Sequence, residues 1–215
     1  MSYVYSNHTI MPFSQASISQ IDLIRYFNSI QPITQGFINQ IIDNTFTVNV
    51  KKNKFLLSPL EPNSYLFFVN SGLVRGFIKE DGKDISTWFS FGKEIIGAFR
   101  DPANTVKPSI EYLQALEDCE LLAIPYDLID ELYLEFPETN VIGRKILAMQ
   151  YHQASERSIL ARIPSAQKRY ERFMEISPLG VTQIPLKCIA SYLGMRMETL
   201  SRIRNKMVKP KKDAA

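Results

Sequence analysis

The segment from Leu186 to Asn205 constrains the fold more than any other part of this chain. Counted from Leu186, an alanine stands fifth (Ala190) and a glycine ninth (Gly194). Two helices joined by a tight turn come closest at the small residue, and glycine accepts the positive φ that such a turn requires. Apolar residues occupy the places that would bury the face shared by the two helices: Ile189, Leu193, Met195, Leu200 and Ile203. The pattern predicts a helix-turn-helix.

The second helix of this motif should begin near Arg196 or Met197 and should present a polar face. An arginine can pair with guanine through two hydrogen bonds, and a glutamate can accept one from the amino group of cytosine. Such a face fits a recognition helix that lies in the major groove of double-stranded DNA. An ordinary helical hairpin with a basic surface is the competing interpretation. The candidate DNA-binding residues are Arg196, Glu198, Thr199, Ser201, Arg202 and Lys206, with Asn205 on the same side.

The distribution of charge agrees with a polyanionic partner for the C-terminal third. The whole chain of 215 residues has a formal net charge of only +3. Residues 1–150 hold 12 Lys and Arg against 17 Asp and Glu, whereas residues 151–215 hold 13 against 5. Because phosphate contacts need cationic side chains, this asymmetry favours nucleic-acid binding by the C-terminal part.

The rest of the chain changes its hydrophobic period twice. Apolar residues at helical spacing predict two short helices between Ser17 and Asn44. Short β-branched and aromatic runs, separated by turn signals such as Glu80-Asp81-Gly82-Lys83, predict seven or eight antiparallel strands from Phe46 to Ile124. A short helix should then end before Phe136, a long helix should run over 138–160, and Pro164 should open another helix that continues through Met174.

Four stretches of the sequence resemble the Crp/Fnr family, the relatives of the cyclic-AMP receptor protein. The stretch from Ile189 to Arg204 is similar to the family's helix-turn-helix, and the stretch from Ala166 to Phe173 is similar to the helix before it. The stretches from Tyr65 to Phe77 and from Ala115 to Ile124 resemble a central hairpin and the last strand of the family's barrel. The resemblance spans roughly residues 35 to 207.

The resemblance implies an α+β fold with three parts. A cyclic-nucleotide-binding-like double-stranded β-helix barrel with N-terminal helices would occupy residues 1–137, and a dimerisation helix and hinge would occupy 138–163. A helix-turn-helix domain of winged-helix type, with its wing short or absent, would occupy 164–215. In the family's recognition helix, Glu198 and Arg202 match base-reading residues. Met197 stands where the cyclic-AMP receptor protein has a second guanine-reading arginine, so the preferred DNA sequence should differ there.

The barrel does not match the family's pocket for a cyclic nucleotide. Ala98, after Gly97, stands where the resemblance requires a glutamate for the ribose, and Ser109 or Pro108 stands where it requires an arginine for the phosphate. A buried phosphate without a cationic partner is poorly compensated, so another effector, or none, is expected. A more apolar ligand walled by aromatic side chains and a barrel without a ligand remain as two alternatives. The pocket candidates are Gly97, Ala98, Phe99, Ser109 and Phe89, with Phe91 and Tyr112 as further aromatic wall residues.

Other classes of function find little support in the sequence. The histidines are His8 and His152, so the histidine cluster of a metal-dependent barrel enzyme is missing, and we expect no catalytic residue, metal or cofactor. Cys119 and Cys188 are far apart, and neither a membrane span nor a secretory signal is evident, which favours a cytoplasmic protein. Expected partners are double-stranded DNA, a second copy through 138–160 and an unknown small-molecule effector, with RNA polymerase as a further candidate. The alternative is a ligand-binding or protein-interaction module whose helix-turn-helix no longer binds DNA.

Overall fold

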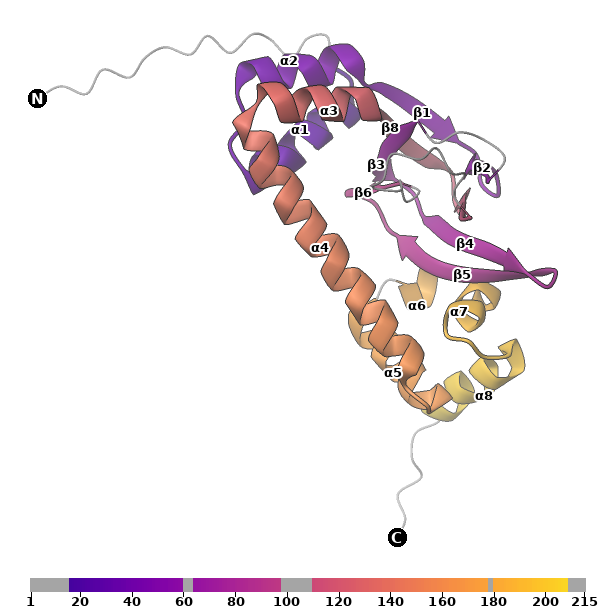
Figure 1. The fold of residues 1–215 in the computed structure, drawn as a ribbon. Coiled ribbons are helices and arrows are strands. Elements are labelled where there is room, and N and C mark those ends of the chain that lie inside the picture. The colour runs from indigo at the N-terminus through magenta and orange to yellow at the C-terminus, as the bar shows by residue number, and fades with distance from the viewer. Residues whose placement is uncertain (1–15, 60–63, 98–109, 178–179, 209–215) are drawn as a thin grey trace, which may run out of the picture.

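The computed structural model describes residues 16–59, 64–97, 110–177 and 180–208. A β-barrel lies between a group of helices at one end and a second group at the other, and one long helix runs along the side and joins the groups (Figure 1). The helices are α1 (Ile18–Ile30), α2 (Gln35–Asn44), α3 (Tyr126–Glu135), α4 (Pro137–Arg162), α5 (Ala166–Ile176), α6 (Gly180–Gln183), α7 (Leu186–Tyr192) and α8 (Met197–Val208).

The barrel consists of two four-stranded antiparallel sheets within the described residues. One sheet has the strand order β1-β8-β3-β6 and the other has β2-β7-β4-β5. Their facing sides bury small and branched side chains, such as Val69 and Ala123 from the first sheet and Val74 and Ala115 from the second. This confirms the predicted α+β architecture. The strands are β1 (Phe46–Val50), β2 (Phe55–Leu57), β3 (Tyr65–Ser71), β4 (Val74–Glu80), β5 (Lys83–Ser90), β6 (Glu94–Ile96), β7 (Tyr112–Ala115) and β8 (Cys119–Pro125).

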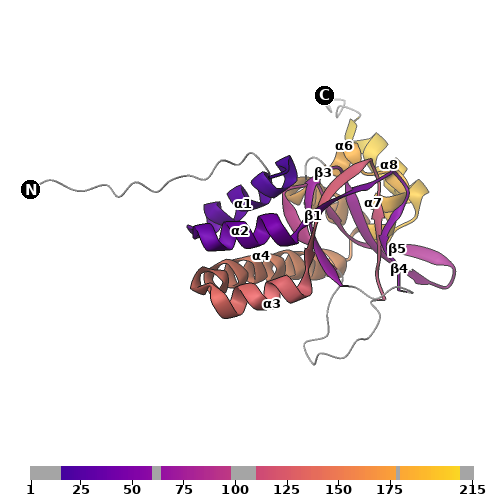
Figure 2. The same cartoon turned by 90° about the horizontal axis from the view of Figure 1, so that it is seen from above.

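The N-terminal helices form a layer with α3 and the first turns of α4, seen from above in Figure 2. Ser17 caps α1 and Thr34 caps α2, each through a side-chain oxygen that accepts from a backbone amide of the first turn. Glu138 at the start of α4 accepts from both the amide and the hydroxyl of Thr34, at 3.0 and 2.8 Å. These bonds fix the start of α4 beside α2, and a core that includes Phe37 and Ile142 closes the layer.

The long helix α4 is two residues longer at its C-terminal end than the predicted 138–160. Pro137 opens it, as suits a residue whose missing N–H is not needed in the first turn, and it ends before Ile163-Pro164. The next helix, α5, begins at Ala166 and ends at Ile176, so its predicted bounds from Pro164 to Met174 were wrong by two residues at each end. The reason at the N-terminus is Ser165, whose hydroxyl accepts from the Lys168 amide and caps the helix.

None of the helices in the described part of the chain is both long and apolar enough to cross a membrane.

Candidate nucleic-acid interface

The turn between α7 and α8 has the geometry that Ala190 and Gly194 predict. Gly194 has a φ of +60°, in the left-handed region that favours glycine. Its amide donates to the Ser191 carbonyl at 3.1 Å, and the next amide, of Met195, donates to the Ala190 carbonyl at 3.0 Å. Ala190 is buried, as expected for the place where the two helices meet. The helix-turn-helix is therefore present as the sequence predicts.

The inner face of the motif is packed against α5. Ile189 and Leu200 are fully buried, and Leu193 and Ile203 are nearly so, whereas Met195 is only half-buried. Tyr170 and Phe173 of α5 belong to the same core. Leu200 and Ile203 anchor α8 in this core, and the opposite side of the helix is exposed to solvent.

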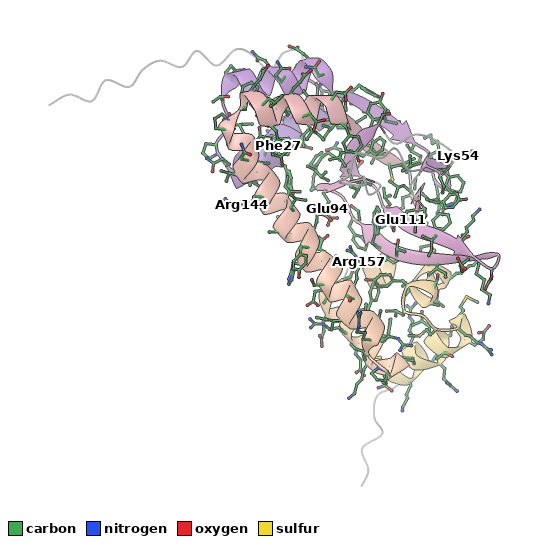
Figure 3. All side chains as sticks on the ribbon, in the orientation of Figure 1. Phe27, Lys54, Glu94, Glu111, Arg144 and Arg157 are labelled. Carbon is green, nitrogen blue, oxygen red and sulfur yellow. The ribbon has the colours of Figure 1, made fainter. Side chains whose placement is uncertain are left out.

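The outer face of α8 carries most of the predicted DNA-binding residues. Arg202 and Lys206 are exposed, Ser201 is half-buried, and Glu198 is exposed in the first turn. Thr199 lies outside this face and is half-buried, and Arg196 is exposed just before the helix starts. Figure 3 shows the side chains of α8 at the lower edge of the molecule, away from the barrel. The residues that share this face are Met197, Glu198, Ser201, Arg202, Asn205 and Lys206.

Arg169 on α5 positions the motif, a role that the sequence did not indicate. Its guanidinium donates to the carbonyl of Leu193 in the turn, at 2.8 Å, and to that of Ile163 after α4, at 2.7 Å. A weaker contact of 3.5 Å reaches the Gly194 carbonyl. The side chain thereby links the end of the long helix to the turn before α8. Nothing in the sequence distinguishes Arg169 from its neighbours Lys168 and Arg172, because its partners are backbone carbonyls.

Helix α7 also lies against the edge strand β5 of the barrel (Figure 1). Arg75 of β4 is almost completely buried, and its guanidinium pairs with the Asp84 carboxylate at 3.0 Å. The same guanidinium lies 4.1 Å from the centre of the Phe77 ring and donates to the Cys188 sulfur of α7 at 3.3 Å. The barrel and the helix-turn-helix are therefore joined by a specific polar contact.

The C-terminal core extends into the barrel as well. Leu73 and Leu116, from loops at the end of the barrel, are buried in the same cluster as Tyr170 and Phe173. The predicted pocket residue Phe89 packs on this cluster, with its ring 5.3 Å from that of Tyr192 in an edge-to-face contact. The expectation that Phe89 walls a ligand inside the barrel was therefore wrong, because alternation along β5 turns its ring toward α7. Phe91 packs on the same cluster.

The other predicted pocket residues fall at the end of β6 and in the segment that follows it. Gly97 is half-buried, and a side chain in its place would collide with Leu66. Ala98, Phe99 and Ser109 lie outside the described residues.

Open space in the barrel occurs elsewhere, between β1, β2, β3 and β8. The cavity has a volume of about 290 Å³ and is lined on one side by Val48 and Val50 and on the others by Leu56, Phe67 and Leu121. Ser64 lies at its edge.

Comparison with known proteins gives a consistent picture. Residues 47–136 match the family described as cyclic nucleotide-binding domain. The chain is 24% identical over 172 residues to an anaerobic regulatory protein of Pasteurella multocida, a match that covers 74% of this chain and 62% of that protein. It is 25% identical over 166 residues to the transcriptional activator protein anr of Pseudomonas aeruginosa, which covers 72% of this chain and 67% of that protein.

The fold agrees with solved structures of related proteins. FixK2 from Bradyrhizobium japonicum superimposes with a TM-score of 0.63 and 19% identity, over 79% of this chain and 89% of that one. At this identity the likeness concerns the fold. The names of the sequence relatives are those of regulators and not of enzymes.

Proposed function

We propose that this chain, which belongs to the Crp/Fnr family of transcription regulators, binds specific sequences in double-stranded DNA through helix α8. The observation that carries the proposal is the outer face of α8, where Glu198, Arg202 and Lys206 are exposed beside one another on a helix anchored in a packed core. A helix presented in this way fits the major groove of DNA, about 12 Å wide.

The chemistry of this face suits the reading of base edges. Arg202 can donate two hydrogen bonds to a guanine, and Glu198 can accept from the amino group of a cytosine. Lys206 and Asn205, further along the helix, suit phosphate oxygens, which position the protein without reading the sequence. Met197 has no donor, so a contact there would be with an apolar group such as the methyl of thymine.

The exposed side of α4 supports assembly into a dimer. Leu147 and Tyr151, one turn apart, are 66% and 76% exposed, and Ile159 further along is 55% exposed. A stripe of large apolar side chains on a solvent-exposed helix is typical of a helix that packs on a partner. Two copies paired along α4 would present two recognition helices to half-sites about 34 Å apart, one turn of DNA.

Regulation would change the orientation of the helix-turn-helix relative to the barrel. An effector can shift this arrangement only if it binds one setting more tightly than the other. The contacts of α7 with β5, and those of Arg169 with the end of α4, are the links through which the barrel would bias α8. The two cysteines that the structure describes are free and buried, which suits the reducing cytoplasm.

The alternative is a protein-interaction module that has lost DNA binding, and salt dependence separates the two. We would titrate the purified protein into a labelled random-sequence duplex between 50 and 200 mM salt. If α8 and its surroundings neutralise about four phosphates, the logarithm of the binding constant should fall with a slope near −3.6 against the logarithm of salt concentration. Arg202→Ala should lower the affinity. Arg25→Ala, at an exposed arginine on α1 far from the motif, is the matched control and should leave it unchanged. Binding that is absent at 50 mM salt, or independent of salt, would favour the interaction module.

A further inference from the structure

We propose that the cavity between β1, β2, β3 and β8 is a binding site for an uncharged, apolar small molecule. The proposal rests on the proposed function only where it treats this molecule as the effector of a regulator. The binding site itself is inferred from the geometry of the barrel. It differs in position from the expected pocket near Gly97 and Phe89.

The size of the cavity suits a small ligand. Its volume of about 290 Å³ is just below the range of about 300–1,000 Å³ that is typical of small-molecule sites. The walls come from four strands of the barrel, so the space is held open by the hydrogen-bonded ladders of β1 with β8 and of β3 with β8.

Aromatic rings surround the opening. Phe46 of β1, Phe55 of β2 and Tyr65 of β3 line the cavity and are 48%, 50% and 36% exposed. Phe46 and Tyr65 meet edge to face, with ring centres 5.5 Å apart. Exposed aromatic rings gathered around a hollow are typical of a ligand-binding mouth rather than of a plain protein surface. A bound molecule would cover their inner faces.

The walls exclude a charged ligand. The lining consists of aliphatic and aromatic side chains apart from the hydroxyls of Ser64 and Tyr65, and none of the described lining residues is charged. On β4, which lies in the same sheet as β2, the cations are engaged elsewhere: Arg75 pairs with Asp84, and Lys79 lies 4.8 Å from the centre of the Tyr112 ring. A phosphate or carboxylate in this cavity would lose its hydration without gaining a cationic partner. The ligand class is therefore an uncharged aromatic or short acyl molecule.

The protein contains one tryptophan, and it lies close to the cavity. Trp88 of β5 is half-buried and, like the lining residue Leu56, packs against the cluster of Leu57 and Leu113. Its emission can be transferred to a naphthylamine dye, whose own emission rises in apolar surroundings. Energy transfer from Trp88 therefore reports that the dye lies in or near the barrel, and the variants of the lining residues identify the cavity as its site.

The test uses the full chain without DNA and N-phenyl-1-naphthylamine, an uncharged aromatic dye, as the probe. We expect saturable binding of one dye per chain, with dye emission excited through Trp88. Val48→Phe and Val50→Phe, which fill the cavity from the half-buried strand β1, should each weaken binding at least about tenfold. Ile85→Phe, the same kind of enlargement at an exposed position of β5, is the matched control and should leave the affinity unchanged. Cyclic AMP at millimolar concentration should not displace the dye.

Three results would overturn the proposal: no saturable binding, equal binding by wild type and by both folded valine variants, or displacement of the dye by cyclic AMP. Circular dichroism of each variant shows whether it is folded. Because the assay contains no DNA, its outcome is independent of the proposed function. If the protein binds the dye but not DNA, the cavity proposal stands and the DNA-binding proposal is contradicted. If it binds DNA but not the dye, the DNA-binding proposal stands and the cavity proposal is contradicted.

Discussion

The backbone amide of Ser86, in the barrel strand β5, donates a hydrogen bond to the hydroxyl of Ser191 in α7, at 3.0 Å. The same hydroxyl donates to the carbonyl of Asp84 at 2.7 Å, so one side chain of the helix-turn-helix satisfies two backbone groups at the edge of the barrel. Open strand edges otherwise leave such groups unpaired. The contact holds α7 in register with β5 and makes the setting of the DNA-binding motif depend on the barrel.

Replacing Ser191 by alanine should loosen this contact. The substitution removes both hydrogen bonds of the hydroxyl, worth about 1 kcal/mol each, so the amide of Ser86 should exchange with solvent roughly thirtyfold faster. Hydrogen exchange resolved by residue measures this directly. Ser29→Ala, at an exposed hydroxyl of α1, should leave the Ser86 amide unaffected. Equal exchange in wild type and Ser191→Ala would mean that the contact does not hold α7 to the barrel.

Gly194→Ala and Gly82→Ala form a matched pair. Both glycines have positive φ, +60° and +71°, and a Cβ at either would meet no atom within 4 Å. Each substitution therefore costs only backbone strain, about 1 kcal/mol, and should lower Tm by roughly 2–4 °C. Only Gly194→Ala should also weaken DNA binding, because that turn sets the angle between α7 and α8. Thermal unfolding measures the change in Tm, and a duplex titration measures the change in DNA affinity. An equal loss of DNA binding in the two variants would contradict the role of the Gly194 turn.

Tyr151→Glu should separate the predicted dimer. A carboxylate in the middle of the apolar stripe of α4 would be desolvated opposite the same carboxylate of the second copy. The free energy lost by this desolvation and repulsion exceeds the free energy gained from the contact between the two helices. Sedimentation velocity should give a particle near the chain mass of 24.7 kDa, against about twice that mass for wild type. The same change at Asn140, an exposed residue near the start of α4, should leave the dimer intact. A wild-type monomer at micromolar concentration would refute the assembly.

Glu94 gives the stability a defined dependence on pH. Its side chain lies on β6 facing α4 (Figure 3), where burial raises the pKa of Glu94, and the Ser90 hydroxyl and the nearby Arg157 guanidinium lower that pKa by less. Tyr26 of α1 is also close enough to feel its charge. The folded chain therefore holds this proton at a pH where the unfolded chain has lost it, and the contribution of Glu94 to stability falls as pH rises between the two pKa values.

The uncharged variant Glu94→Gln should accordingly raise Tm at neutral pH. The gain should vanish below the ordinary pKa of a glutamate, about 4.3, where wild type is neutral in both states. Glu131→Gln, on the exposed side of α3, should have no such effect. Thermal unfolding over a range of pH tests this, and a lower Tm of Glu94→Gln at pH 7 would reverse the sign of the argument.

The parts of the molecule that follow from local sequence pattern were predicted well. The small residue and the glycine of the turn identify the helix-turn-helix, and period-two runs between turn signals identify the strands. Helix ends were less certain, because a single capping hydroxyl such as that of Ser165 decides them. What escaped prediction are contacts between residues distant in sequence, such as Arg75 with Cys188 and Ser191 with Ser86. The direction in which Phe89 points was missed for the same reason, since nothing local indicates which layer will cover β5.

Selection of bound sequences from a random duplex pool tests the central claim most directly. The account predicts that wild type enriches a palindromic motif with half-sites one helical turn apart, and that Arg25→Ala enriches the same motif. Arg202→Ala should lose the preference at one position of each half-site while it keeps salt-dependent, unspecific binding. If wild type enriches no motif, both alone and with a pool of small molecules from a cell extract, the chain is not a sequence-specific regulator. An identical motif from Arg202→Ala would remove α8 from the role of recognition helix.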